Sequence, residues 1–273
     1  MHKHFSNPSD LSWRRFVAIW GRAAKVGQTD MDSAAYAIEA AIEADHWWFV
    51  GRRLLFSDLI KGFGLPQDAE ILDVGTSTGT NLRLLRDLGF ARITGVDQSP
   101  DAIRFCAEKG LGAVQLGDIR ALQLPEQRFD LVLATDVIEH VDDDLAALRE
   151  LRRVLRPGGY LLLTVPAFHL LWGLQDDVSH HKRRYRLHRL LKMLPVADLS
   201  PRRYFYFNYL LFLPILAARR LMRRLKIRVA SENEINIGWF NRALTRVFRF
   251  DVRTAPWLRP PIGVSALVVA TRT

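Results

Sequence analysis

The chain has 273 residues, of which 49% are hydrophobic and 25% charged, a balance that excludes an intrinsically disordered protein. Its single cysteine excludes an internal disulfide and is typical of a reducing compartment. The net charge of +10 is uneven, because residues 181–273 carry 20 Lys and Arg against 4 Asp and Glu, whereas residues 1–180 carry 19 against 25. The C-terminal third therefore either faces an anionic partner or forms a solvated basic surface.

The first 64 residues predict helices. Apolar residues recur at helical spacing in LSWRRFVAIW, SAAYAIEAAIEA and RRLLFSDLIKGFG, with polar residues on the opposite faces. The N-terminus has Trp and Arg throughout and no continuous apolar core, so it is unlike a signal peptide. We expect an N-terminal helical cap over residues 1–64, followed by the main domain over residues 65–273.

From residue 70, short apolar runs alternate with amphipathic segments. EILDVG, RITGVD, AVQLGD, FDLVLATD and YLLLTVP predict strands, and DDDLAALRELRRVLRPGG predicts the helix before the last of them. This alternation indicates βαβ units in a doubly wound α/β fold, with a mostly parallel sheet that is buried on both faces.

The last hundred residues are less regular. HRLLKMLP predicts a helix, LSPRRYFYFNY a strand, LLFLPILAARRLMRRLKIR a helix with a break near Pro214, and PIGVSALVVATRT a final strand. We expect a lid or a membrane-facing helical insertion at about residues 205–260.

The segment ILDVGTSTG places small residues between a strand and a helix. Ligands of open parallel sheets bind at the carboxyl ends of the strands, where amides at a helix N-terminus favour an anionic group. Gly75 and Gly79 allow the backbone to approach such a ligand closely. Asp73 lies at the end of this strand, Asp97 ends the next strand, and Asp118 follows the third. At its position Asp97 can accept hydrogen bonds from ribose hydroxyls.

Four segments in this order, ILDVGTSTG, ITGVDQSPDAI, GDIRALQLPEQRFDLVLATDVIEHV and LRRVLRPGGYLLLTVP, resemble the class I S-adenosylmethionine-dependent methyltransferases. The resemblance covers residues 70–165. It implies a Rossmann-like sheet of seven strands, with GVSALVVATRT as the last, antiparallel strand, and S-adenosyl-L-methionine as cofactor.

The resemblance also implies roles around the cofactor. Asp73 and the glycine loop would face the methionine portion, Asp97 would hold the ribose, and Asp118 and Ile119 would flank the adenine. Family members usually have glycine where this chain has Ser77. The expected cofactor-binding residues are Asp73, Gly75, Ser77, Gly79, Asp97, Gln98, Asp118, Ile119 and Asp136.

The segment TDVIEHV has two interpretations. Asp136 and Glu139 have the spacing of a helix capping box. Alternatively, the resemblance places Asp136 and His140 at the end of the fourth strand, beside the transferring methyl group. Some O-methyltransferase relatives hold a divalent metal with acidic residues and a histidine at this point. Asp136, Glu139 and His140 match this pattern loosely, but we expect no metal.

The segment DDVSHHKRRYR follows the fifth strand. In related chains a similar segment lies over the substrate pocket, and imidazole titrates near neutral pH, so a histidine here is a candidate general base. The candidates, in order of preference, are His181, His180 and His140. Lys182, Arg183 and Arg184 are candidates for binding phosphate or carboxylate, unless the segment is a basic surface turn.

Another aromatic segment, DHWWFVGRR, precedes the sheet. Trp47, Trp48 and Phe49 would roof the cofactor, line an apolar acceptor pocket, or pack in the core. We expect Arg52 and Arg53 to remain in solvent.

Residues 209–228 predict an amphipathic helix. Their uncharged run is shorter than the roughly 20 residues that span a bilayer. The arrangement is typical either of an interfacial helix on anionic lipid or of a lid helix with a solvated basic face. Leu221, Met222 and Leu225 would form one face, and Arg219, Arg220, Arg223, Arg224 and Arg228 the other.

These features together predict a cytoplasmic methyltransferase with peripheral membrane contact through residues 209–228. Its acceptor would offer an oxygen or nitrogen on a small or lipid-linked molecule. A nucleic-acid methyltransferase is the second candidate because the C-terminal third is basic. Against it, ATDVIEHV lacks the Asn/Asp-Pro-Pro-aromatic run of enzymes that methylate exocyclic base amines. A nonenzymatic membrane adaptor with the cofactor fold is the third.

Overall fold

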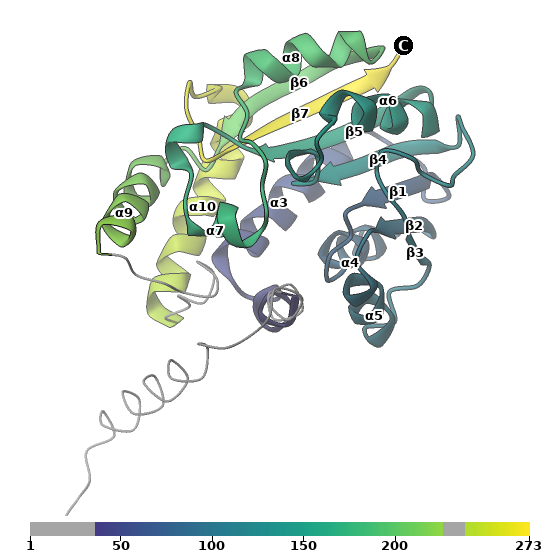
Figure 1. The fold of residues 1–273 in the computed structure, drawn as a ribbon. Helices are drawn as coiled ribbons and strands as arrows, with labels where there is room; N and C mark the ends of the chain where they lie inside the picture. The colour runs from purple at the N-terminus through teal and green to yellow at the C-terminus, as the bar shows by residue number, and fades with distance from the viewer. Residues whose placement is uncertain (1–35, 226–237) are drawn as a thin grey trace, which may run out of the picture.

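Seven strands in the order β3-β2-β1-β4-β5-β7-β6 form the central sheet of a computed structural model that describes residues 36–225 and 238–273 (Figure 1). Neighbours from β3 to β5 pair in parallel, whereas β7 is antiparallel to both β5 and β6. The predicted antiparallel last strand is therefore confirmed. The strands are β1 (Glu70–Val74), β2 (Arg92–Asp97), β3 (Val114–Leu116), β4 (Phe129–Thr135), β5 (Leu155–Pro166), β6 (Leu199–Phe207) and β7 (Ser265–Arg272).

Helices cover both faces of this sheet (Figure 1). On one face lie α3 (Trp47–Gly62), α4 (Thr80–Asp87) and α10 (Gly238–Leu258), and on the other α6 (Asp144–Val154) and α8 (Leu187–Val196). The remaining helices are α5 (Pro100–Glu108), α7 (Leu174–Val178), α9 (Phe212–Arg224) and the short 3₁₀ helices η1 (Ile138–His140) and η2 (His169–Leu171).

Alternate residues of the central strands enter two separate cores. Ile71, Leu131 and Leu162 pack with α3 and α10, while Leu72 and Val132 pack with α6 and α8. Because both faces are covered, these strands are nearly continuous apolar runs rather than alternating ones. That pattern is the reason why the sequence predicted them well.

The parallel pairing of the strands also determines where the candidate site lies in the fold. β1 lies between β2 and β4, and Asp73 is in register with Gly95 on one side and Leu133 on the other. Strands that run parallel in register end at the same edge of the sheet. The loops that follow Val74, Asp97 and Thr135 are therefore neighbours.

Two predicted helix boundaries are wrong, both at prolines. The helix expected to continue to Gly159 ends at Val154, and β5 begins at Leu155, because Pro157 disfavours helical backbone before it. The break expected near Pro214 does not occur. Pro214 lies in the first turn of α9, where its missing N–H costs no helical hydrogen bond.

The sequence prediction missed α10. This helix packs along α3, where Trp48 stacks on Phe248 at a ring-centroid distance of 5.3 Å and Trp47 N donates to Asn241 Oδ1 at 2.8 Å. Both α9 and α10 lie between β6 and β7, within the expected insertion. The division of the chain at residue 64 stays a prediction, and the LSWRRFVAIW helix lies outside the described residues.

Within the part of the chain that the structure describes, none of the helices has both the length and the apolar character needed to cross a bilayer.

Candidate functional site

The loop between β1 and α4 needs residues that tolerate left-handed backbone. Gly75, Ser77 and Gly79 have φ angles of 75°, 49° and 89°. A Cβ atom on Gly75 would lie 2.3 Å from the Val137 side chain, and one on Gly79 would lie 2.3 Å from Leu111. The two glycines therefore serve both the turn and its close packing.

Asp97 ties this loop to the next one. The buried carboxylate accepts hydrogen bonds from the Ser77 N–H and the Ser99 N–H, both at 2.9 Å. Burial raises its pKa, while the amide hydrogen bonds lower it. The carboxylate thus connects the loop after β1 to the loop after β2.

Asp73 lies beneath the loop and is fully buried. Its Oδ1 accepts a hydrogen bond from Asn81 Nδ2 at 2.9 Å, but its Oδ2 has no hydrogen-bond partner among the described residues. Burial raises the pKa of Asp73 to about 7. A buried carboxylate with an unused oxygen is costly for stability alone, and such groups concentrate at functional sites.

A cavity of about 960 Å³ joins most of the predicted cofactor residues. Asp73, Gly79 and Asp118 are not among the described residues that line it. Asp118 is half-buried, with a side chain that is 40% exposed, and it pairs with Arg120 at 2.5 Å. The predicted cofactor residues that do line the cavity are Gly75, Ser77, Asp97, Gln98, Ile119 and Asp136.

Two acidic residues that the sequence prediction missed attach the helical residues 36–42 and the turn after them to the glycine loop. Glu39 hydrogen-bonds the side chain of Ser77, the residue that replaces the usual glycine. Glu43 accepts a hydrogen bond from the hydroxyl of Thr78 and pairs with Lys109 at 2.7 Å. Nothing local in the sequence marks these contacts, which join residues 35 or more positions apart.

Of the two interpretations of this segment, the capping box at Asp136 and Glu139 is wrong. Asp136 has a φ of 59° and pairs with Arg52 at 2.9 Å, and η1 has no side-chain cap. Arg52 was expected in solvent, but its side chain is only 15% exposed. Arg53, also expected in solvent, donates to the carbonyl oxygens of Glu43 and Ala44.

Glu139, His140 and His181 gather at the cavity wall. Their ligand atoms, one from each residue, all lie within 4.8 Å of one another, so this group could hold a metal ion. Glu139 is fully buried, and burial raises its pKa well above the ordinary value. Burial lowers the pKa of His140 to about 4. His180 lines the same cavity, so all three candidate bases reach it.

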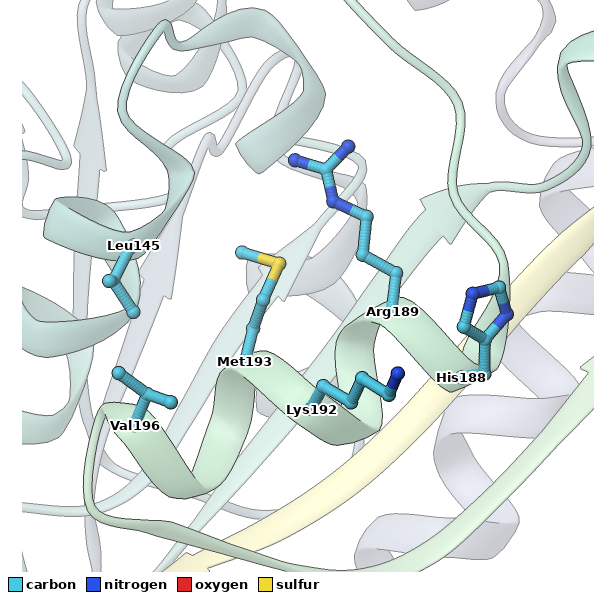
Figure 2. Close-up of a pocket in the computed structure, with 6 residues that line it drawn as sticks. All are labelled: Leu145, His188, Arg189, Lys192, Met193 and Val196. Atoms are coloured by element: carbon cyan, nitrogen blue, oxygen red, sulfur yellow. The ribbon is translucent and has the colours of Figure 1, made fainter.

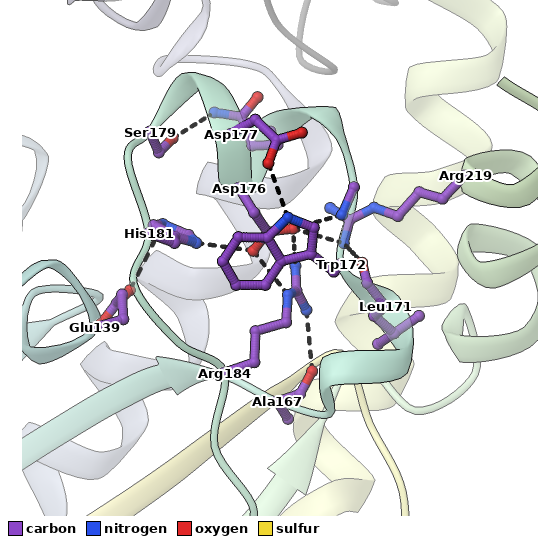
Figure 3. A network of polar contacts seen from close by, with 12 residues as sticks. Glu139, Ala167, Leu171, Trp172, Asp176, Asp177, Ser179, His181, Arg184 and Arg219 are labelled. Atoms are coloured by element: carbon purple, nitrogen blue, oxygen red, sulfur yellow. Dashed lines mark hydrogen bonds and ion pairs between the residues drawn. The ribbon is translucent and has the colours of Figure 1, made fainter. Parts of the chain in front are cut away.

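Asp176 organises the wall beside these histidines (Figure 3). It accepts hydrogen bonds from Arg184 Nε at 2.7 Å and from Gly173 N at 2.7 Å, and it lies 2.8 Å from His181 Nδ1. Arg219 of α9 also approaches it, at 3.7 Å. The cations and hydrogen bonds hold the pKa of Asp176 well below its usual range.

The basic residues of this segment pair within the protein. Lys182 pairs with Asp142 at 2.6 Å and Arg183 with Asp144 at 2.9 Å, while Arg184 is engaged by Asp176. Lys182 and Arg184 line the cavity, whereas Arg183 is not among the lining residues. A role in binding phosphate or carboxylate stays a prediction for them.

The aromatic residues of DHWWFVGRR both line the cavity and pack in the core. Trp47, Trp48 and Phe49 are lining residues, and Trp47 also meets Phe248 of α10 edge to face at 5.3 Å. A separate hollow of about 270 Å³ lies at α8 (Figure 2) and contains none of the predicted site residues. It is lined by Leu145, His188, Arg189, Lys192, Met193 and Val196.

Comparisons with known proteins agree with this geometry. Residues 72–163 match the family model described as a methyltransferase domain. The malonyl-acyl-carrier-protein O-methyltransferase of Serratia marcescens is 34% identical over 146 residues, which cover 53% of each chain. The fatty-acid O-methyltransferase of Mycolicibacterium smegmatis is 38% identical over 99 residues, 34% of this chain and 36% of that protein. The chain thus spans about half or less of the lengths of these relatives.

A solved structure supports the fold alone. Phosphoethanolamine N-methyltransferase 2 of Haemonchus contortus, in complex with S-adenosyl-L-methionine, aligns with a TM-score of 0.55 at 16% identity, over 81% of this chain and 52% of that one. The matched segment, the strand order and the loop geometry agree. Residues 72–163 thus resemble the methyltransferase domain family, and this similarity supports a class I S-adenosylmethionine-dependent methyltransferase with S-adenosyl-L-methionine as its cofactor.

Proposed function

We propose that the protein transfers a methyl group from S-adenosylmethionine to an oxygen atom of a lipid-like acceptor. One observation supports this most strongly: a single cavity is lined both by the strand-end loops and by apolar residues of the insertion. The apolar lining residues beyond β6 include Leu211, Pro214, Ile215, Met222, Phe240 and Leu244. Relatives named for fatty-acid and malonyl-acyl-carrier-protein O-methylation point to the same acceptor class.

The residues present fit the cofactor. Asp97 would accept hydrogen bonds from the ribose hydroxyls, since its carboxylate lies at the cavity wall where the β1 and β2 loops meet. The unused Oδ2 of Asp73 would compensate positive charge near the methionine portion. When bound, the cofactor supplies a methyl group already activated on a sulfonium. The protein's task is then to orient the acceptor and exclude water, and good alignment supplies about 7–11 kcal/mol in intramolecular reactions.

His181 is the preferred base among the three candidates. Asp176 can only accept a hydrogen bond, so His181 Nδ1 carries the proton and Nε2 is left able to receive one. The acceptor hydroxyl would give its proton to this nitrogen as the oxygen takes the methyl group, leaving the cofactor as a neutral thioether. His140 would act nearby as a neutral imidazole because burial lowers its pKa.

The insertion also suggests how a lipid-like acceptor is reached. Two arginines of the predicted basic face are engaged within the protein, because Arg219 donates to the Leu171 carbonyl oxygen and Arg223 to that of Trp172. The division of α9 into an apolar and a basic face stays a prediction. Both α9 and α10 carry exposed apolar residues and exposed arginines, a composition that suits anionic lipid. We propose that this surface contacts the membrane. Its apolar residues are Leu213, Leu221, Leu225, Trp239, Phe250 and Trp257, and Arg228 lies outside the described residues.

Substituting Asp97 should weaken cofactor binding. Asp97→Asn removes the negative charge of a carboxylate that accepts hydrogen bonds from two backbone amides. Charge-assisted hydrogen bonds contribute about 1.5–3 kcal/mol, so we expect the affinity for S-adenosylmethionine to fall about 10- to 100-fold. Asp118→Asn, at a half-buried carboxylate paired with Arg120, is the matched control and should stay within about twofold. Calorimetric titration measures both. Unchanged affinity in Asp97→Asn, or a larger loss in Asp118→Asn, would contradict the assigned site.

Asp73 should make the stability of the cofactor-free protein depend on pH. Its pKa is about 7 in the folded state against an ordinary value of 3.8, so the folded state holds a proton that the unfolded state releases. The free energy of unfolding should therefore fall as pH rises from about 4 to 7, by up to about 4 kcal/mol for this group at 1.36 kcal/mol per unit. In Asp73→Asn this part of the pH dependence of the free energy of unfolding should be absent. Urea unfolding across this range tests it, and parallel profiles for the two proteins would refute it.

The acceptor class can be tested directly. Purified protein would be incubated with methyl-labelled S-adenosylmethionine and a fractionated cell extract, with Asp97→Asn as the impaired control. We expect label in the lipid fraction. Label in water-soluble small molecules would overturn the lipid-like acceptor, label in RNA would favour the nucleic-acid alternative suggested by the basic C-terminal third, and no transfer would overturn the proposed activity.

The membrane contact has its own test. We expect the protein to sediment with vesicles that contain phosphatidylglycerol more strongly than with phosphatidylcholine alone, and less so at high salt. The double variant Leu221→Asp, Leu225→Asp should bind at least about tenfold more weakly, because burying each leucine contributes about 1.5–3 kcal/mol. Leu116→Asp, at an exposed leucine of β3, should bind like the parent. Equal binding by the double variant would rule this surface out.

A further inference from the structure

Asn208 directly follows β6 and lies in a turn that a buried carboxylate holds in place. Asp251 of α10 is fully buried and accepts hydrogen bonds from the Asn208 N–H at 2.7 Å and from the Leu210 N–H at 2.9 Å. The Asn208 carbonyl oxygen accepts a hydrogen bond from the Val264 N–H at 3.3 Å. Both backbone groups of Asn208 are therefore paired, which fixes the place of its side chain.

The turn alone does not explain why this residue is asparagine. Asn208 has a φ of 58°, a left-handed conformation that asparagine tolerates and that glycine adopts without steric cost. The residue is only 1% exposed, yet neither Oδ1 nor Nδ2 of its side-chain amide has a hydrogen-bond partner among the described residues. A buried polar group without a partner costs about 1–3 kcal/mol, a penalty that glycine at this position would avoid.

Asn208 lines the same cavity as the cofactor loops, at a distance from them. β7 is antiparallel to both β5 and β6, so β6 runs in the direction of β5 and ends at the edge of the sheet where β4 and β5 end. Three strand spacings separate the ends of β4 and β6 in the order β4-β5-β7-β6 (Figure 1). At the usual spacing of roughly 4.8 Å, the two strand ends lie about 14 Å apart.

The chemistry of the amide defines which group can pair with it. An asparagine side chain offers two N–H donors and one accepting oxygen. A carboxylate only accepts hydrogen bonds and an ammonium only donates them, so either would leave part of the amide unpaired. The surroundings also disfavour an anion, because Val264 and Leu211 line the cavity with apolar groups and the Asp251 carboxylate lies 2.7 Å from the Asn208 backbone nitrogen. A neutral hydroxyl or carboxamide group is the complement.

We propose that Asn208 is a recognition residue for the acceptor. Its side-chain amide would hydrogen-bond a hydroxyl or carboxamide group that the acceptor carries at a distance from the oxygen that is methylated. This inference rests on the proposed function, because it takes the apolar part of the cavity as the acceptor site. Asp251 would be a positioning residue, since its carboxylate acts through the backbone that presents Asn208.

Three octyl compounds serve as probes of this contact in calorimetric titrations of the full chain without cofactor. Octanamide and 1-octanol both donate and accept hydrogen bonds, whereas methyl octanoate only accepts them. Asn208→Gly should weaken the binding of octanamide, of 1-octanol or of both at least about tenfold, and that of methyl octanoate by a clearly smaller factor. The compound that loses more affinity identifies the group as a carboxamide or a hydroxyl.

Asp198→Gly is the matched control at the other end of β6. Asp198 has a φ of 53°, its side chain is 72% exposed, and it is not among the described residues that line the cavity. The same substitution at a similar backbone conformation should therefore leave the binding of all three probes within about twofold of the parent.

Thermal unfolding separates recognition from a structural role. Glycine suits the turn and removes an unpaired amide, so Asn208→Gly should unfold at the same or a higher temperature than the parent. A lower unfolding temperature, no probe binding by the parent, unchanged binding of octanamide and 1-octanol in Asn208→Gly, or an equal loss for all three probes would overturn the proposal. S-adenosylmethionine is titrated separately, so failure of the cofactor site and failure of the Asn208 contact give different results.

Discussion

The parallel register of β1 with β2 and β4 is the constraint on which the site depends. It brings the ends of three strands to one edge of the sheet, so the loops after Val74, Asp97 and Thr135 become neighbours. Asp97 then joins two of these loops through the amides of Ser77 and Ser99. Without this register, residues 20 or more positions apart would not form one cavity.

The site and its immediate surroundings contain two buried carboxyl groups with unpaired oxygens among the described residues. Asp73 and Glu139 are buried carboxyl groups whose oxygens are not all paired within the described chain, and burial raises the pKa of both. A core built only for stability would use apolar residues at such positions. These two residues are therefore better explained by what binds beside them. Asp176 shows the contrast, because two arginines and a backbone amide surround its carboxylate.

The sequence predicted the sheet and the cofactor loops well, because both depend on local patterns. Strands covered on both faces are continuous apolar runs, and Gly75, Gly79, Asp73 and Asp97 lie at or just after strand ends. The helix α10 was missed although its buried residues recur at the i, i+3, i+4 and i+7 spacing of a helix, so its signal was present in the sequence. These residues are Phe248, Asp251, Val252 and Ala255.

The rest of the site depends on contacts between distant parts of the chain. Arg52 pairs with Asp136, and Glu139 meets His181, across 84 and 42 positions. No local pattern indicates such pairs. The capping-box interpretation failed for this reason, since the Asp136 carboxylate is engaged by an arginine from α3.

Hydrogen–deuterium exchange with and without S-adenosylmethionine tests most directly whether one cofactor site spans the ends of β1 and β2. Peptides that cover the loops after Val74 and Asp97 should both become protected, with half-maximal protection at the same cofactor concentration. Binding that protects only one of these loops, or neither, would show that they do not form a common site.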